Sequence, residues 1–173
     1  QVDAAVQCYE KALTINPNYA QAHLNLGLVH QERGQVDDAV KLYEKALAIN
    51  PNYAQAHLNL GLVHQERGQV DEAVKKFEKT LATNPNYAEA YYNLSSINQY
   101  TISDAQITQM QSLLSTSDLS QSDRIYFCFA LARVYENLGN QDEFFKFLHE
   151  GNRLCKEEFN YSLDQDQNLF SII

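Results

Sequence analysis

Four histidines are the side chains of this sequence whose type and spacing most invite a chemical interpretation. His23 and His30 stand seven residues apart, and the same pair recurs at His57 and His64. A metal site needs close geometry and usually a carboxylate or cysteine as a further ligand. The alternative is that the imidazoles pack half-buried between helices. The positions of these histidines in the sequence repeat decide between metal binding and packing.

Paired acidic residues are the second candidate for chemistry. Asp37 and Asp38, and their counterparts Asp71 and Glu72, could in principle act as acid and base. Both pairs fall in the first turn of an expected helix, where negative charge is favourable at the positive end of the helix dipole. We therefore interpret them as helix-cap residues. The chain also has no Gly-rich phosphate-binding loop, so we predict no catalytic residue and no cofactor.

The elements that carry these side chains are repeated. Residues 16–37 recur letter for letter as residues 50–71, an offset of 34 residues, and a drifted third copy begins at Asn84. A fixed period of this length is typical of units that bury their apolar faces only by stacking on their neighbours. The expected product is an elongated stack with a long binding surface.

Each unit reads as two helices. Apolar residues at helical spacing run from Ala20 until Gly34, and again from Val36 until Pro51, where proline disfavours further helix. The pair forms an antiparallel hairpin around a short Gly turn. Glycine inside the first helix, as at Gly27, costs about 1 kcal/mol relative to alanine. We therefore expect another backbone to pass too close there for a side chain.

The order of small and large residues resembles the tetratricopeptide repeat (TPR) family. The resemblance implies an all-α fold, a right-handed α-solenoid of antiparallel helix hairpins that forms a TPR superhelix. Histidine replaces both aromatic residues of the first helix, which favours packing over metal ligation, and we predict no metal site. The matching positions are His23, Leu26, Gly27, His30, Ala39, Tyr43, Ala46 and Pro51, then His57, Leu60, Gly61, His64, Ala73, Phe77, Thr80 and Pro85.

The repeat decays towards the C-terminus. Serines followed three residues later by Gln or Asp start three further helices, at Ser103, Ser120 and Ser162. Aligning Gly139 with Gly34 identifies a divergent fourth repeat. The opening half repeat suggests that the chain is a fragment of something longer. The expected parts are a half repeat (1–19), TPRs (20–53 and 54–87), a degenerate TPR-like hairpin (88–119), a divergent TPR-like hairpin (120–160) and a C-terminal capping helix (161–173).

Residues 123–170 carry a second resemblance. The segments at 129–132 and 151–154, followed by Tyr161, are similar to the region that joins the repeats to the catalytic domain in bacterial TPR–sulfotransferase proteins. This resemblance implies a non-catalytic recruiting arm of a larger enzyme, with the sulfotransferase domain beyond Ile173. A stand-alone scaffold or assembly protein with no enzymatic domain is the alternative, and a structural spacer is a third interpretation.

The expected binding surface is the inner wall made by the first helix of each hairpin. Asn25, Asn59 and Asn93 recur there once per repeat. A side-chain amide can donate to and accept from an extended peptide backbone, and the arrangement resembles the asparagine ladder of the O-linked N-acetylglucosamine transferase. The alternative is that the asparagines serve only hydrogen bonds between helices. The wall also includes Gln21, Gln55, Leu28, Leu62 and Tyr92, beside Leu24, Leu58, Gln31, Gln65, Glu89, Ser96 and Gln99.

The charges of the wall and of the whole chain exclude several classes of binding partner. The wall has no cation with which to clamp a terminal carboxylate, as chaperone-binding TPR domains do. The net charge is −9 without a basic tract, which argues against nucleic acid and anionic membranes. We expect a neutral or basic protein or extended peptide, and self-association through exposed solenoid ends.

The remaining features bear on location. No apolar run approaches the roughly 20 residues of a membrane span, and no signal peptide opens the sequence. Cys8, Cys128 and Cys155 are isolated from one another. We expect them to be reduced and buried, which predicts a cytoplasmic protein.

Overall fold

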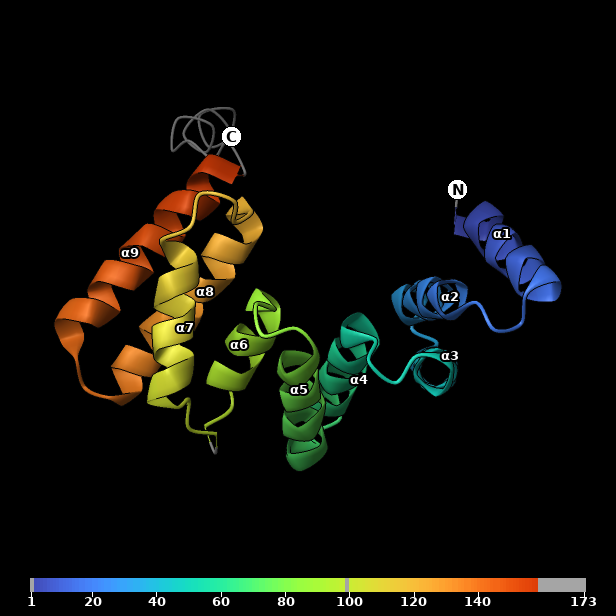
Figure 1. Ribbon diagram of the computed structural model, residues 1–173, viewed down its shortest axis with the longest axis horizontal. Coiled ribbons are helices and arrows are strands. Elements are labelled where there is room, and N and C mark those ends of the chain that lie inside the picture. The colour runs from blue at the N-terminus through green and yellow to red at the C-terminus, as the bar shows by residue number, and fades with distance from the viewer. Residues whose placement is uncertain (1, 99, 159–173) are drawn as a thin grey trace, which may run out of the picture. The chain divides into compact units, whose positions relative to one another are not determined.

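The computed structural model describes residues 2–98 and 100–158, in which all regular structure is helical, as predicted. The chain divides into two compact units, Gln1–Pro85 and Asn86–Ile173. The first unit contains α1 (Val2–Ile15), α2 (Ala20–Glu32), α3 (Val36–Ile49), α4 (Ala54–Glu66) and α5 (Val70–Thr83) (Figure 1). The second contains α6 (Ala88–Ser95), α7 (Asp104–Leu114), α8 (Gln121–Asn137) and α9 (Gln141–Glu158). The capping helix expected at 161–173 lies outside the described residues.

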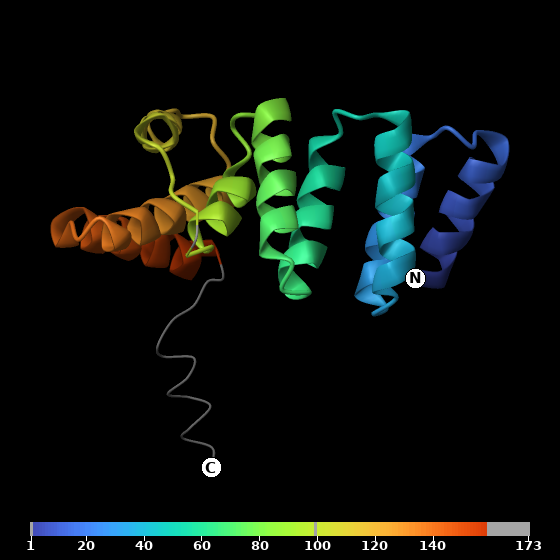
Figure 2. The same cartoon turned by 90° about the horizontal axis from the view of Figure 1, so that it is seen from below.

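The turn inside each regular hairpin is set by one glycine. Gly34 has a φ of +73°, and its amide donates to the Gln31 carbonyl at 2.9 Å while the Gln35 amide donates to the His30 carbonyl at 2.9 Å. This is a Schellman motif, which glycine favours because it lacks a Cβ. The chain reverses there, so α2 and α3 pack as an antiparallel hairpin, as do α4 and α5 (Figure 2).

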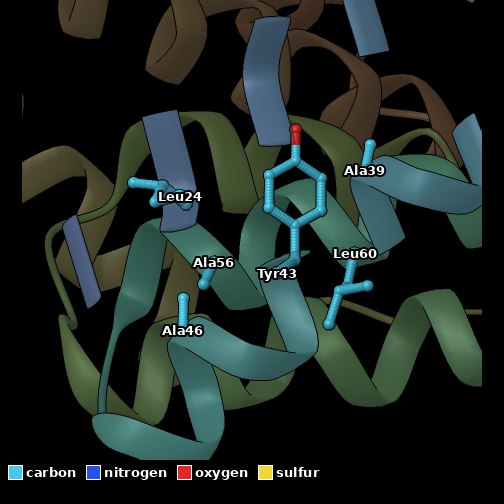
Figure 3. Close-up of a cluster of buried hydrophobic side chains, with 6 residues drawn as sticks. All are labelled: Leu24, Ala39, Tyr43, Ala46, Ala56 and Leu60. Atoms are coloured by element: carbon cyan, nitrogen blue, oxygen red, sulfur yellow. The ribbon is translucent and has the colours of Figure 1, made fainter. Parts of the chain in front are cut away.

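The core of the first unit contains two fully buried aromatic rings, those of Tyr43 and Phe77. Tyr43 is fully buried among Leu24, Ala46, Ala56 and other small or aliphatic side chains (Figure 3). A Cβ added to Gly27 would lie 2.6 Å from the Tyr43 ring, and one added to Gly61 would lie 2.5 Å from the ring of Phe77. Glycine is therefore required by a neighbouring ring, and the expectation of a neighbouring backbone was wrong.

The second unit is less regular at its start. Residues 88–119 contain α6 and α7, but α6 packs mainly against α8 rather than against α7, with the Tyr91 and Phe127 rings 5.8 Å apart. The segment after α6 has no glycine of the kind that ends α2 and α4. Helix α7 instead begins at a complete capping box between Ser103 and Gln106, which confirms the predicted start.

Helices α8 and α9 form the principal hairpin of the second unit. The Ser120 side chain caps α8 by accepting from the Asp123 amide, and Gly139, with a φ of +71°, makes the turn. The two helices pack extensively, with the rings of Tyr135 and Phe147 stacked at 5.8 Å. The start of α8 and its turn therefore lie where the sequence predicted them.

Candidate functional site

Asn25 is the first amide of the expected peptide-binding wall. It lies half-exposed on α2, one turn after Gln21. The Gln21 side-chain amide donates to Asn25 Oδ1 at 2.8 Å, and the Tyr53 hydroxyl donates to Gln21 Oε1. Two neighbouring side chains therefore orient the Asn25 amide. Its oxygen faces Gln21, and its nitrogen remains available.

Asn59 occupies the same register on α4 but is far less accessible. Only 3% of the residue is exposed. Gln55 Nε2 donates to Asn59 Oδ1 at 3.0 Å, which repeats the Gln21–Asn25 arrangement. Asn59 Nδ2 is buried and makes no hydrogen bond with any described residue. A buried donor without a well-aligned acceptor is unfavourable, and the polar group beside the Asn59 side chain is the Tyr43 hydroxyl.

Tyr43 connects the two asparagine-bearing helices, a role that the sequence analysis missed. Its hydroxyl donates to Gln31 Oε1 of α2 at 2.7 Å. Burial raises the pKa of Tyr43 to about 12, while the adjacent Asn59 amide acts in the opposite direction. The signal available in the sequence was a hydroxyl at a core position where the next repeat has Phe77.

Asn93 behaves differently in the second unit. It is 8% exposed, and its Nδ2 donates to the Glu89 carbonyl of the preceding turn at 2.8 Å. Burial raises the pKa of the Glu89 carboxyl, and the charge of Asp123 raises it further. Tyr92 is half-buried, and its ring lies 5.6 Å from that of Tyr126. The third amide is thus engaged with its own helix.

The leucines of the wall divide into two groups. Leu28 is 36% exposed and Leu62 is half-buried, so both contribute apolar surface. Leu24 and Leu58 are 3% and 0% exposed. Including these two in the wall was wrong, because Leu24 packs in the core cluster around Tyr43 and Leu58 is completely covered.

Two of the four repeated histidines, His23 and His57, are buried packing residues, whereas His30 and His64 are half-buried and bond Gln35 and Gln69. His23 Nε2 lies 2.9 Å from the Pro17 carbonyl and His57 Nε2 lies 2.9 Å from the Pro51 carbonyl, so each ring donates a proton there. Both residues are 8% exposed, and each Nδ1 is buried without a partner among the described residues. Within 2–98 and 100–158, no cluster of three or more His, Cys, Asp or Glu residues could hold a metal ion.

Three of the four first-turn acidic residues, Asp37, Asp38 and Glu72, form ion pairs. Asp38 bonds Lys41 at 2.9 Å, and Asp37 bonds Arg67 at 2.5 Å, so both first-turn carboxylates of α3 are in ion pairs. The N-cap residue of α3, Gln35, makes no side-chain capping hydrogen bond. Cys128 is buried, and burial raises the pKa of its thiol to about 11. Cys8 is exposed, so the expectation that all three cysteines are buried was wrong: no described element covers that face of α1.

Pockets lined mainly by apolar surface lie in the second unit. One, of about 470 Å³, lies among α7, α8 and α9 beside Cys128 and Phe147. Arg124 at its edge donates to the carbonyls of Leu114 and Thr116, and so holds the end of α7. A second pocket, of about 340 Å³, is lined by Tyr92, Phe129, Ala132, Arg133, Glu136, Phe144 and Leu148. His149 and Glu150 also line the first of these pockets, and the charge of Glu150 adds to burial in raising the pKa of the Cys128 thiol.

Family comparison agrees with this geometry. A family model described as a TPR repeat matches residues 1–32, 31–68 and 66–99, more than half of the chain. The chain belongs to the TPR family. These matches cover the whole first unit and α6 of this TPR protein, while α7, α8 and α9 lie beyond them. No curated protein sequence matches it.

Several solved structures share the fold. A crystal structure of MamA is 24% identical, covers 92% of each chain and has a TM-score of 0.61. YrrB, described as a TPR protein with an unusual peptide-binding site, is 16% identical over 86% of this chain and 93% of its own, with a TM-score of 0.57. An O-GlcNAc transferase mutant from Thermobaculum terrenum is 26% identical over 78% of this chain and 23% of its own, with a TM-score of 0.51. At such identities the two former similarities establish the fold.

The length and hydrophobicity of the described helices bear on whether any of them could span a membrane. None of the helices between residues 2 and 158 combines the length and apolar character that a membrane span requires.

Proposed function

We propose that this TPR chain is a non-catalytic module that binds an extended segment of a protein or peptide. The binding surface in the first unit is the amide face, which we define as Asn25, Asn59, Gln21, Gln31, Gln55, Leu28 and Leu62. The observation that carries the proposal is the repeated Gln–Asn pair, which presents a pre-oriented amide at the same register of α2 and α4. Repetition at this register suits a ligand that is itself periodic, such as an extended backbone.

Asn93 and Tyr92 extend the proposal into the second unit. Both lie on α6: Asn93 is the counterpart of Asn59 in the next repeat, and Tyr92 is the counterpart of Leu58. Tyr92 also lines the smaller apolar pocket. We propose that this part of the protein contacts a side chain of the partner, while the amide face contacts its backbone.

The proposed partner is neutral or basic. The chain has 22 acidic residues against 13 Lys and Arg, so an anionic partner such as nucleic acid would be repelled at long range. YrrB, a protein of the same fold, is described as having a peptide-binding site, which supports a peptide ligand. We further propose a cytoplasmic location and self-association through the ends of the repeat stack.

The finer proposal is that the chain recruits substrates or partners for a larger TPR–sulfotransferase. The Thermobaculum terrenum transferase supports the general arrangement, since the present chain covers only 23% of that protein. Repeats of this kind therefore occur within much longer chains. A stand-alone scaffold remains the alternative. The gene sequence following Ile173 discriminates the two: a strand and phosphate-binding loop would support the enzyme arm, and a stop codon would contradict it.

The main experiment is a peptide-library selection on the wild-type chain, followed by calorimetry on the variant Asn25→Ala/Asn59→Ala/Asn93→Ala. A neutral hydrogen bond contributes about 0.5–1.5 kcal/mol, so the triple variant should lose about 1.5–4.5 kcal/mol of binding free energy. The matched control is Asn18→Ala/Asn52→Ala, which removes exposed amides from turns outside the amide face. Unchanged affinity of the triple variant, with its circular dichroism intact, would refute the proposal.

A further inference from the structure

Helix α6 departs from the regular repeats at two positions of the wall. Glu89 stands where α2 and α4 have Gln21 and Gln55, and Tyr92 stands where they have leucine. Both side chains are half-buried. Residues three apart are neighbours on one face of a helix. A carboxylate and an aromatic ring have therefore replaced an amide and an aliphatic side chain at adjacent positions.

Helix α8 brings a matching pair of side chains to this part of α6. The rings of Tyr92 and Tyr126 lie 5.6 Å apart and are tilted by 49°. Burial raises the pKa of the Glu89 carboxyl and the charge of Asp123 raises it further, so the two carboxylates are close enough to repel each other. The Ser120 hydroxyl donates to Asp123 Oδ2 at 2.6 Å and orients that carboxylate. Two carboxyl groups and two aromatic rings thus converge from two helices.

The described part of the chain supplies no cation that pairs with these carboxylates. None of the ion pairs within 2–98 and 100–158 includes Glu89 or Asp123. Burial raises the pKa of Tyr126, the charges of Glu89 and Asp123 raise it further, and no described cation opposes them. Arg124, the next residue along α8, instead donates to carbonyl groups at the end of α7. Negative charge therefore accumulates here without an internal partner.

Asn93 adds an independent observation, an acceptor without a donor. The residue is 8% exposed, and its Nδ2 donates to the Glu89 carbonyl at 2.8 Å. Its Oδ1 therefore points away from that carbonyl, and no described residue donates a hydrogen bond to it. Polar side-chain atoms of residues buried this deeply usually have a partner. Because Asn93 lies one turn after Glu89 on the same helix face, its oxygen can accept from the same ligand as the carboxylates.

We propose that Glu89, Tyr92, Asn93, Asp123 and Tyr126 form a site for one arginine side chain of the bound partner. This inference rests on the proposed function and names the residue that the second unit recognises. A guanidinium group is planar, always charged and has five N–H donors, so it can bond carboxylate and amide oxygens while one face lies on an aromatic ring. A metal ion is the other cation to consider, but no described group of three or more His, Cys, Asp or Glu residues could hold one.

The peptide selected on the wild-type chain tests the site from the ligand side. We expect the peptide to contain arginine at one fixed position. Replacing that arginine by citrulline keeps the shape but removes the charge, and should weaken binding by about tenfold or more. Lysine should bind with intermediate affinity, because it keeps the charge but lacks the planar group. Equal affinity of the citrulline peptide, or of the lysine peptide, would overturn the assignment to arginine.

Variants that restore the regular repeat test the site from the protein side. Glu89→Gln and Tyr92→Leu copy Gln55 and Leu58, so the fold should persist. Glu89→Gln combined with Asp123→Asn should weaken binding of the arginine peptide by about tenfold or more and remove the preference for arginine over citrulline. Tyr92→Leu should weaken binding about two- to fivefold, and Tyr92→Phe, which keeps the ring, should weaken it less.

The control removes two carboxylates elsewhere in the second unit. Asp118→Asn/Asp142→Asn makes the same change in net charge at exposed positions, and should alter the affinity by less than about twofold because distant charges are screened. If no peptide is selected at all, the proposed function fails. If a peptide is selected but binds wild type and Glu89→Gln/Asp123→Asn equally well, peptide binding stands and the arginine site is refuted.

Discussion

Both units of this protein contain helix hairpins, but different residues fill the space between the two helices. In the first unit, Gly61 leaves room for the ring of Phe77, which would lie 2.5 Å from an added Cβ. In the second, alignment of the turn glycines places Ala132 and Leu148 at those positions, and both line one pocket of about 340 Å³. Relative to the first unit, the first helix of the second hairpin has the larger residue, Ala132 for Gly61. Its partner helix has the smaller one, Leu148 for Phe77.

A second exchange runs in the opposite direction. Leu24 and Ala46 share the core cluster of the first unit. Their counterparts in α8 and α9 are Phe129 and Gly151, and a Cβ on Gly151 would lie 2.9 Å from the Phe129 ring. In both exchanges the combined volume of the two facing side chains changes less than the volume of either one. Protein interiors tolerate little empty or excess space, which explains this balance.

The two units also differ in where they place side-chain amides. The register that holds Asn25 and Asn59 in the first unit holds Ala130, which is fully buried, in α8. Hydrogen-bonding amides consequently belong to the regular repeats and to α6. Aromatic and apolar surface replaces them in α8 and α9.

Overpacking the regular hairpin should have the largest effect on stability. Gly61→Leu drives a side chain into the Phe77 ring and should lower the free energy of unfolding by about 1–3 kcal/mol. Chemical denaturation followed by circular dichroism measures this. Glu66→Ala, an exposed change on the same helix, should alter stability by less than about 0.5 kcal/mol. A Gly61→Leu protein as stable as wild type would contradict the packing described here.

The second unit suggests a rescue. Gly61→Ala combined with Phe77→Leu copies the Ala132–Leu148 pair. The double variant should be more stable than the sum of the two single losses indicates, because the smaller side chain gives way to the added methyl group. If the loss of stability in the double variant equals the sum of the two single losses, the two positions do not compensate each other in volume.

Acid should destabilise the first unit through His57. Burial lowers the pKa of His57 below its ordinary value of 6.5, and the facing charges of Lys76 and Lys79 lower it further, against the hydrogen bond to Pro51. The unfolded chain therefore binds a proton more readily than the folded one. The stability contribution is complete above pH 6.5 and is lost as the pH falls below that value.

The second unit again supplies the variant, since Tyr91 occupies the register of His57. His57→Tyr should reduce the loss of stability between about pH 7.5 and about pH 5.5, where histidine titrates. His64→Gln, which removes a less buried histidine of the same helix, is the matched control variant. Identical profiles for wild type and His57→Tyr would rule out this histidine as the cause.

The smallest effect is expected at the surface ion pair between Asp37 and Arg67. Their nitrogen and oxygen atoms lie 2.5 Å apart, but the Asp37 side chain is 84% exposed. Exposed pairs contribute about 0–1 kcal/mol and are screened by salt. Asp37→Asn should therefore lower stability by at most about 1 kcal/mol at low salt, with the difference disappearing in concentrated salt. A loss that persists at high salt would indicate another role for Asp37.

Sequence reasoning succeeded where local geometry decides the outcome. The ends of α2 and α8 follow from Gly34 and Gly139, and the start of α7 follows from Ser103 and Gln106. It failed for the burial of Cys8 and Leu24, because burial depends on which neighbouring element covers a face of the helix. Helical periodicity identifies an apolar stripe but not the width of the surface that a neighbour covers.

The sequence alone therefore determined the repeat, the helices and the register of the asparagines, because a 34-residue period and a glycine with positive φ are properties of the chain itself. Only the tertiary structure decided how those amides are used. The hydroxyl of Tyr53 reaches Gln21, 32 residues earlier in the chain, and the hydroxyl of Tyr43 reaches Gln31 on the neighbouring helix. Hydrogen bonds of this kind arise only when packed helices bring both groups together, and they orient the amides that we propose to meet the ligand.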